Sequence, residues 1–423
     1  MAADGEKRPG VRGDGKTEPQ AAANGEMAGG SSAWRRIGAF FLSPRNLYIL
    51  GFLVVLALTF AEVSRGRHRN FMIFAESTRL FWQQIPPYGA NWPPAGMELD
   101  YFLYGPLFNV LFAPFAFLPA WLGPFVWNLF NFTAWFAAIF TLPARFTREE
   151  KCKTFLYTFL ILACTLLSFQ YNPLVGSIFL FAYSLLERDK GFWAVLLILL
   201  SGFTKIYGIF QLGLLVCYPR FWRNAAYAAA IGAVLLVVPA IGTTWEGLPG
   251  WYGEWVGALT SHKDTRTWMT VFYLRPFNLL RIQTWVQAGV LAALGAGLLL
   301  DRRRWCNEFF RIGCLAALMG YVIFFSNSSE RHTYCIALAG YMLWYWTMRR
   351  AGALTAFDRT MFWAVFAVLV VMPVDVLCPP SVMEFFFGWQ LNLWLFLALW
   401  LRIVWTTLVR MPQQLRSEPQ AGL

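Results

Sequence analysis

The sequence predicts an all-α polytopic membrane protein, and three features lead to that prediction. Of the 423 residues, 58% are hydrophobic and only 14% are charged, whereas soluble domains carry about 25% charged residues. The mean hydropathy is +0.48, so the chain has too little polar surface to cover a soluble globule. Apolar blocks also recur from Leu47 almost to the C-terminus, separated by short polar or basic turns, as in proteins that cross a bilayer repeatedly.

The chain divides into a tail, a membrane domain and a short end. Residues 1–33 are rich in Gly, Ala, Lys, Asp and Glu and have no apolar period, which is typical of disorder. This segment is too long and too mixed in charge for the n-region of a cleaved signal, so Leu47–Val63 is expected to be an uncleaved first spanning helix. We expect a disordered cytoplasmic tail (1–33), a transmembrane domain (34–410) and a short C-terminal tail (411–423).

The net charge of +12 does not indicate a nucleic-acid partner, because the basic residues do not form one patch. They lie in short clusters between apolar blocks, as in the cytoplasmic loops of membrane proteins. The clusters are Arg35/Arg36, Arg145/Arg148/Lys151/Lys153, Arg220/Arg223, Arg302/Arg303/Arg304 and Arg349/Arg350. We therefore expect the lipid bilayer as partner, no nucleic acid, and a multi-pass protein of the cell (plasma) membrane with a cytoplasmic N-terminus.

The cysteines and histidines indicate neither a disulfide framework nor a metal site. The seven cysteines form no C-x-x-C pair and have no tight spacing to the three histidines, as structural zinc sites require. We expect no metal and no cofactor.

The alternation of blocks and turns predicts about 11–13 membrane segments. The later blocks lie at 155–168, 174–186, 192–203, 209–216, 225–241, 285–300, 309–325, 334–348, 360–374 and 391–409. Several are shorter than the ~20 residues that cross a ~30 Å hydrocarbon core, so we expect broken or re-entrant helices, which are tolerated only beside a cavity. Residues 105–119 and 121–143 resemble two crossings, whereas the alternation of charge allows one.

The first polar loop, 64–104, carries the acids of interest. The stretch "NFMIFAESTRLFW", which includes Glu76, suits a helix lying on the membrane surface. "PPYGANWPPAGMELDYFLYGP" then brings Glu98 and Asp100 back to the bilayer. These acids either cap and solvate the next helix or belong to a functional site at its mouth.

Several cations are expected on the same side of the membrane as these acids. Lys205 lies in "SGFTKIYGIF" between two apolar blocks, and Arg331 and His332 lie in "SNSSERHTY" at another boundary. The loop 242–284 adds Arg266. Lys205 either snorkels to the interface or contacts an anion, and Arg331 either pairs with Glu330 or does the same. Carboxylates facing cations across one membrane surface favour acid/base chemistry beside an anion such as a phosphate.

These residues resemble glycosyltransferase family 87, a branch of the GT-C superfamily of polyprenyl-phosphate-sugar-dependent transferases. The resemblance is carried by "YGPLFNVLFAPFAFLP" (104–119), which is similar to the family's Y-x-P-L-F-x-x-L-x-x-P-x-x-x-L-P element. It continues through "WNLFN" (127–131), "QYNP" (170–173) in place of a G-Q-x-N turn, "TKIYG" (204–208) in place of a K-x-Y/F-P turn, and "SNSSERHTY" in place of a Ser-Pro…His turn.

The resemblance implies a GT-C-like multi-helix bundle with surface helices in its extracytoplasmic loops and an active site at their mouth. It also implies inverting transfer of a hexose, mannose-like, from a polyprenyl-phosphate sugar donor to a cell-envelope glycan or glycolipid acceptor. In the superfamily a first-loop acid is the general base, and many relatives carry Asp directly before an F-x-x-F/Y element. Here that position is Asn70, whose amide cannot accept a proton. The base is therefore Asp100, Glu98 or Glu76, or activity has been lost.

Among these acids Asp100 is the preferred base, because it lies four residues before Tyr104, where the loop re-enters the membrane and the following helix fixes its position. Lys205 and His332 would hold the donor phosphate, with Arg331 or Arg266 assisting.

Two other functions remain open. A transporter or flippase of envelope lipids would show two related halves, and we see no internal repeat. An inactive scaffold of an envelope-glycan complex is the other alternative, and Asn70 is the residue that favours it.

Overall fold

The computed structural model of the protein describes residues 36–261, 270–275, 277, 279–326, 329–372 and 378–416, and only the backbone of Arg331. Within these ranges every regular element is a helix, which confirms the predicted all-α class. The α-helices are α2 (Pro44–Ser64), α3 (Arg69–Trp82), α4 (Pro106–Ala116), α5 (Gly123–Phe140), α6 (Arg148–Leu167), α7 (Asn172–Leu186), α8 (Gly191–Thr204), α9 (Phe221–Val237), α10 (Leu248–Ser261), α11 (Gln283–Leu300), α12 (Glu308–Phe324), α13 (Cys335–Arg350), α14 (Ala356–Phe366), α15 (Pro380–Gly388), α16 (Leu391–Val404) and α17 (Gln413–Arg416). The 3₁₀ and π segments are η1 (Gly89–Asn91), η2 (Ile206–Cys217), η3 (Val238–Ile241), η4 (Val271–Tyr273), η5 (Leu280–Ile282), η6 (Arg302–Cys306), η7 (Arg331–Tyr334), η8 (Ala367–Val371) and η9 (Trp405–Val409). The predicted tail 1–33 lies outside the described residues.

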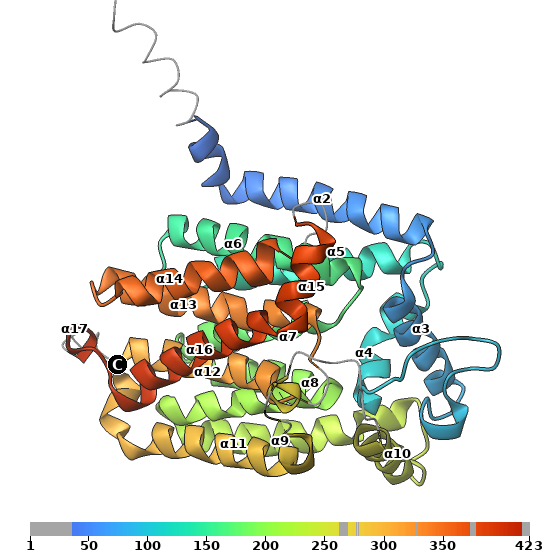
Figure 1. Cartoon of the computed structure of the whole chain (residues 1–423). Coiled ribbons are helices and arrows are strands. Elements are labelled where there is room, and N and C mark those ends of the chain that lie inside the picture. The colour runs from blue at the N-terminus through green and yellow to red at the C-terminus, as the bar shows by residue number, and fades with distance from the viewer. Residues whose placement is uncertain are drawn as a thin grey trace, which may run out of the picture.

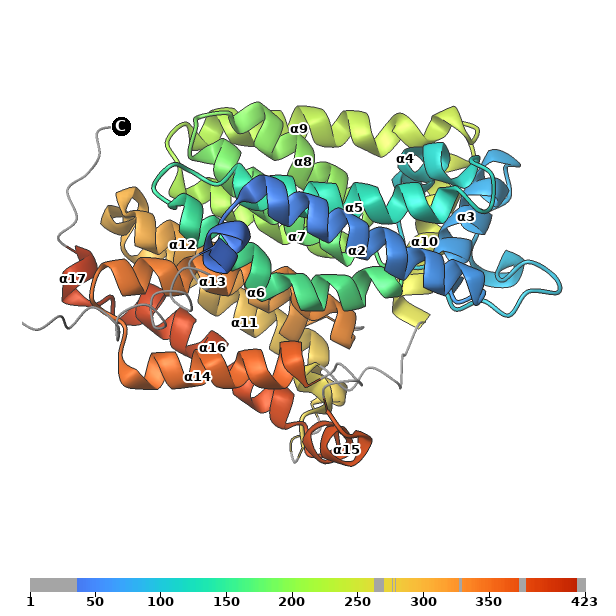
Figure 2. The same cartoon turned by 90° about the horizontal axis from the view of Figure 1, so that it is seen from above.

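The long helices run side by side along one axis, as Figures 1 and 2 show from two directions. α3, α4 and α10 gather at one end of this bundle, and α17 lies at the opposite end. α12 and α13 form the centre: on α13 every side chain from Cys335 to Met348 is buried. A helix that is apolar and buried all round is expected only in the interior of a bundle.

Four helical stretches in the described part of the chain are long and apolar enough to cross a membrane: Pro44–Ser64, Phe221–Ile241, Leu280–Leu300 and Leu391–Val409. Other apolar helices, among them α7, α8 and η2, have 12 to 15 residues. Several apolar helices thus support the multi-pass prediction, and the number of 11–13 segments remains a prediction.

The lengths of α4 and α5 bear on the question of one or two crossings between 105 and 143. α4 has 11 residues and contains Pro114, so it is about 16 Å long and packs against α3 at one end of the bundle. α5 has 18 residues, or about 27 Å. α4 is therefore too short to cross, and we expect α5 to make the single crossing that the alternation of charge allows.

α8 and η2 form a re-entrant hairpin with Lys205 at its tip. α8 has 14 residues and η2 has 12, so they rise about 21 and 24 Å and pack against each other. Gly208 allows the close turn, because a Cβ there would collide with Ser201. Since both arms are shorter than a ~30 Å hydrocarbon core, we expect the tip to lie below the membrane surface.

At the end of the bundle opposite α3, α4 and α10, charged side chains form a network of ion pairs that we call the ionic clasp. Its members are Arg145, Glu187, Glu308, Arg311 and Arg350. Arg145 pairs with Glu187 and, at 2.9 Å, with Glu308. The Arg311 Nε donates to Glu187 Oε1 at 2.6 Å. Arg350 lies 3.6 Å from Glu308. Basic clusters that are far apart in the sequence thus meet at one end, as the positive-inside pattern predicted.

We expect the clasp end and the first loop to face opposite sides of the membrane. Cys306, exposed in η6 close to the clasp end, is a natural reporter, and exposed Glu98 can be changed to Cys as the second. An impermeant maleimide should label Glu98→Cys in intact cells and the Cys306 peptide only after permeabilisation. Labelling of both positions in intact cells would contradict the predicted topology.

Candidate active site

Lys205 is held at the hairpin tip by polar and aromatic partners. Its Nζ donates to Asn172 Oδ1 at 2.7 Å, and it lies 5.4 Å from the ring centroid of Tyr104 and 5.6 Å from that of Tyr207. The Glu330 carboxylate lies within electrostatic range of the ammonium group. These contacts stabilise a cation between two apolar helices, where it would otherwise be costly.

The turn between α6 and α7 brings His332 and Asn70 to one place. Ser168 Oγ lies 3.0 Å from His332 Nε2, and Asn70 Nδ2 donates to the Ser168 carbonyl at 2.7 Å. Thr165 Oγ1 in turn donates to the His332 carbonyl at 3.2 Å. Asn70, which stands where many relatives carry an aspartate, and His332, a predicted phosphate ligand, therefore contact the same residue, Ser168.

Two helices begin beside Lys205. Asn172 is the first residue of α7, and Cys335, the first residue of α13, interacts electrostatically with Lys205 and donates from its Sγ to the His332 carbonyl at 3.3 Å. The cations Lys205 and His332 are thus brought near each other through the first turn of α13, which is a suitable environment for a phosphate.

The predicted acids lie outside this group of cations. Glu76 is paired with Arg79 on α3. Glu98 and Asp100 are exposed, and the Asp100 carbonyl accepts a hydrogen bond from Trp92 Nε1 at 2.8 Å. Within the part of the chain that the structure describes, no hydrogen bond or ion pair joins these two carboxylates to the predicted phosphate ligands. Arg266 lies outside the described residues, and of Arg331 only the backbone, as the start of η7, is described.

The last residues of the first loop are hydrogen-bonded to the α8–η2 hairpin and to α10. The Gly105 amide donates to the Thr204 carbonyl at 3.0 Å, and Trp255 Nε1 donates to the Leu103 carbonyl at 3.1 Å. A Cβ on Gly105 would collide with the Phe203 carbonyl oxygen, so only glycine permits this approach of two backbones. The loop segment that carries Asp100 is thus held by hydrogen bonds against the end of α8, next to Lys205.

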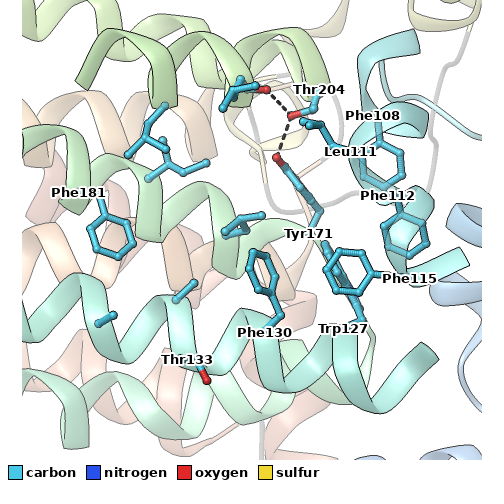
Figure 3. A pocket seen from close by; sticks show the side chains of 16 residues that line it. Phe108, Leu111, Phe112, Phe115, Trp127, Phe130, Thr133, Tyr171, Phe181 and Thr204 are labelled. Carbon is cyan, nitrogen blue, oxygen red and sulfur yellow. Dashed lines mark hydrogen bonds between the residues drawn. The ribbon is translucent and has the colours of Figure 1, made fainter. Parts of the chain in front are cut away.

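An apolar cavity of about 480 Å³ begins next to the Lys205–Asn172 pair. Its polar end is the hydrogen bond of 2.8 Å between Tyr171 Oη and Thr204 Oγ1, the two residues that precede Asn172 and Lys205. Figure 3 shows the cavity extending from there along α5, with Trp127 near the polar end and Phe181 at the far end. Leu111 and Phe130 also line it and are 41% and 45% exposed, so the cavity opens sideways between α4 and α5.

Sequence reasoning missed this cavity and a second histidine. The ring of His68 packs on Phe169 at 6.1 Å between centroids, in the same turn that contacts His332. Burial lowers the pKa of His68, which favours the neutral imidazole. "QYNP" marked the Asn172 turn, whereas no local pattern marks a cavity formed by four helices.

Comparison with known proteins gives one match. The model of glycosyltransferase family 87 matches residues 102–326, more than half of the chain. The matched segment contains Lys205, Asn172 and the residues that line the cavity, and it leaves out the first-loop acids and His332. No curated protein and no solved structure matches the chain.

Proposed function

The chain belongs to glycosyltransferase family 87, a family of membrane glycosyltransferases, and from this premise we propose a specific reaction. The enzyme moves a mannose-like hexose from a polyprenyl-phosphate sugar to a cell-envelope glycan or glycolipid, with inversion at the anomeric carbon. The active site is the extracytoplasmic end that carries the first loop. The protein lies in the plasma membrane with its N-terminus in the cytoplasm.

The observation that carries this proposal is the position of Lys205 between a polar turn and an apolar cavity. A polyprenyl phosphate has an anionic head directly joined to a long apolar chain. Lys205, which Asn172 Oδ1 holds in place, offers its ammonium group to the head, and the cavity that starts at Tyr171 and Thr204 offers an apolar space to the lipid tail. A nucleotide-sugar donor would leave such a cavity empty.

The proposed chemistry needs little beyond charge stabilisation on the leaving-group side. As the bond between the anomeric carbon and the phosphate oxygen breaks, the phosphate leaves as an anion that Lys205 and His332 stabilise. The acceptor hydroxyl attacks from the opposite face and gives its proton to a carboxylate, for which Asp100 is our candidate. Arg331 and Arg266 are further candidates for phosphate contacts.

Asn70 supports one alternative, an inactive scaffold. Its amide donates to the Ser168 carbonyl, so the side chain supports the turn instead of accepting a proton. Purified protein in detergent, given radiolabelled polyprenyl-phosphate mannose and an envelope glycolipid fraction, decides between transferase and scaffold. Labelled product is expected, and its absence with every hexose donor tried would contradict the proposed function.

Lys205→Ala is expected to weaken donor affinity by about 10- to 100-fold, the value of a hydrogen bond to a charged group. Donor binding is measured by isothermal titration with polyprenyl phosphate. The matched control is Lys190→Ala, because Lys190 flanks the opposite end of the same helix, α8, and is exposed. Equal affinity in the Lys205→Ala and wild-type proteins would show that this lysine only anchors the hairpin.

A further inference from the structure

Three exposed arginines, Arg65, Arg67 and Arg69, lie within five residues at the turn between α2 and α3. This turn is at the end of the bundle opposite the ionic clasp. Basic residues collect on the cytoplasmic side of membrane proteins, which we expect to be the clasp end, so topology does not account for this cluster. We propose that Arg67 and Arg69 bind the headgroup of an anionic phospholipid in the extracytoplasmic leaflet.

The end of α2 fixes the backbone of this turn. Gly66 has a φ angle of +66°. Its amide donates to the Val63 carbonyl at 3.0 Å, and the Arg67 amide donates to the Glu62 carbonyl at 2.9 Å. This is the Schellman pattern that ends many helices, and its left-handed position favours glycine. Arg67 is therefore held in a fixed place just beyond the last turn of α2.

Arg67 and Arg69 carry charges that the fold does not compensate. Arg65 has an acidic partner, because its Nη1 lies 3.7 Å from Glu62 Oε1. Among the residues that the structure describes, none forms an ion pair or a side-chain hydrogen bond with Arg67 or Arg69. Arg69 is also the first residue of α3, whose first turn contains no acid, so the helix dipole repels it. The stability of the fold thus explains neither residue, and an anion can neutralise both.

The residues that alternate with these arginines face the protein. The ring of His68 packs on Phe169, and Asn70 donates to the Ser168 carbonyl, whereas Arg67 and Arg69 are exposed. The alternation turns His68 and Asn70 toward the candidate active site and leaves the two arginines on its outer side. Their ligand is therefore a different anion from the donor phosphate.

α2 provides the surface along which the chains of a phospholipid lie. The helix has 21 residues, or about 31 Å, which matches a hydrocarbon core of about 30 Å, so Ser64 at its end is expected at the level of the headgroups. One face of the helix exposes Leu53, Leu56 and Phe60, the last of them by 65%. A phospholipid with its tails against this face has its phosphate beside Arg67. A soluble anion would make no use of the apolar face.

Quenching of a fluorophore by spin-labelled lipids measures the preference of the turn. Bimane is attached to Ser64→Cys in a Cys306→Ser background, because Ser64 is exposed and Cys306 is the exposed cysteine of the described residues. The protein is placed in phosphatidylcholine nanodiscs with either doxyl-labelled phosphatidylglycerol or doxyl-labelled phosphatidylcholine. Phosphatidylglycerol should be preferred by about 25-fold at low salt, about fivefold for each unpaired arginine. High salt should weaken the preference, and equal quenching by the two lipids at low salt would overturn the proposal.

Two double variants test whether these arginines cause the preference. Arg67→Gln/Arg69→Gln should bring the affinities for the two lipids to within about twofold of each other. Arg148→Gln/Arg359→Gln removes the same charge from exposed positions on α6 and α14 and should keep the full preference. A preference that persists in Arg67→Gln/Arg69→Gln, or one that is lost in the matched control, would contradict the location of the site.

Discussion

Replacing Asp100 by Asn is expected to reduce turnover by about 10²–10⁴-fold, the contribution typical of a general base, while donor affinity is largely retained. The amide keeps the shape and the hydrogen-bonding capacity of the side chain but cannot accept a proton. The measurement is steady-state sugar transfer together with donor binding on the same preparation.

The short length of chain between Asp100 and Tyr104 is compatible with this role. In an inverting displacement the phosphate and the base lie on opposite faces of the sugar. Two hydrogen bonds of about 2.8 Å and the intervening bonds then place the base about 10–13 Å from the cation that holds the phosphate. Asp100 precedes Tyr104, whose ring lies beneath Lys205, by four residues of largely extended chain, or at most about 13 Å. Glu330, by contrast, acts directly on Lys205 and is too close to the leaving group.

Two matched variants serve as controls for Asp100. Glu98→Gln changes an exposed acid two residues away, and Glu76→Gln changes an acid that Arg79 already neutralises. Both should retain near-normal turnover. If Asp100→Asn is fully active and one of these two is not, the base is misassigned, although the reaction is correct.

Replacing Glu187 by Ala is expected to destabilise the protein by about 3–5 kcal/mol, as removal of one partner from a buried ion pair does. The Glu187 side chain is only 6% exposed, and Oε1 accepts hydrogen bonds from Arg311 Nε and from Tyr218 Oη, both at 2.6 Å. Without the carboxylate, the nearly buried guanidinium group of Arg311 loses its acidic partner, while Arg145 keeps its ion pair with Glu308. The apparent Tm in detergent, at a fixed scan rate, should fall.

Glu149→Ala is the matched control for the ionic clasp. Glu149 pairs with Lys153 on the same helix, and both side chains are exposed, where solvent screens the attraction. Its apparent Tm should equal that of the wild type. An unchanged apparent Tm in Glu187→Ala as well would mean that the clasp contributes nothing to stability.

The sequence predicted most of the helices because each apolar block is a local signal. The block expected at 334–348, for example, is the helix Cys335–Arg350, and the turn expected around Lys205 is the tip of the hairpin. The short length of α4 was not predictable, because apolar residues continue through 105–143 and composition does not tell a re-entrant helix from a spanning one. Packing against α3 decides that question, and it depends on residues outside the block.

Local patterns indicated the candidate site only in part. Lys205 stood out because a cation between two apolar blocks is costly. The contacts of Ser168 with Asn70 and His332 join segments 98 and 164 residues apart, and no pattern in a single sequence reports such contacts. The cavity is likewise formed by four helices whose apolar side chains look like ordinary core residues one by one.

In the proposed reaction, the opening between Leu111 and Phe130 is the route by which a lipid donor would reach the protein. A lipid that enters from the side never leaves the bilayer, so the search takes place by diffusion in two dimensions within one leaflet. The relevant concentration is then the mole fraction of donor in that leaflet, and the protein competes for it with every other lipid there. Donor that is made on the cytoplasmic face must first change leaflets, so the rate of transbilayer movement can set the rate of glycan synthesis.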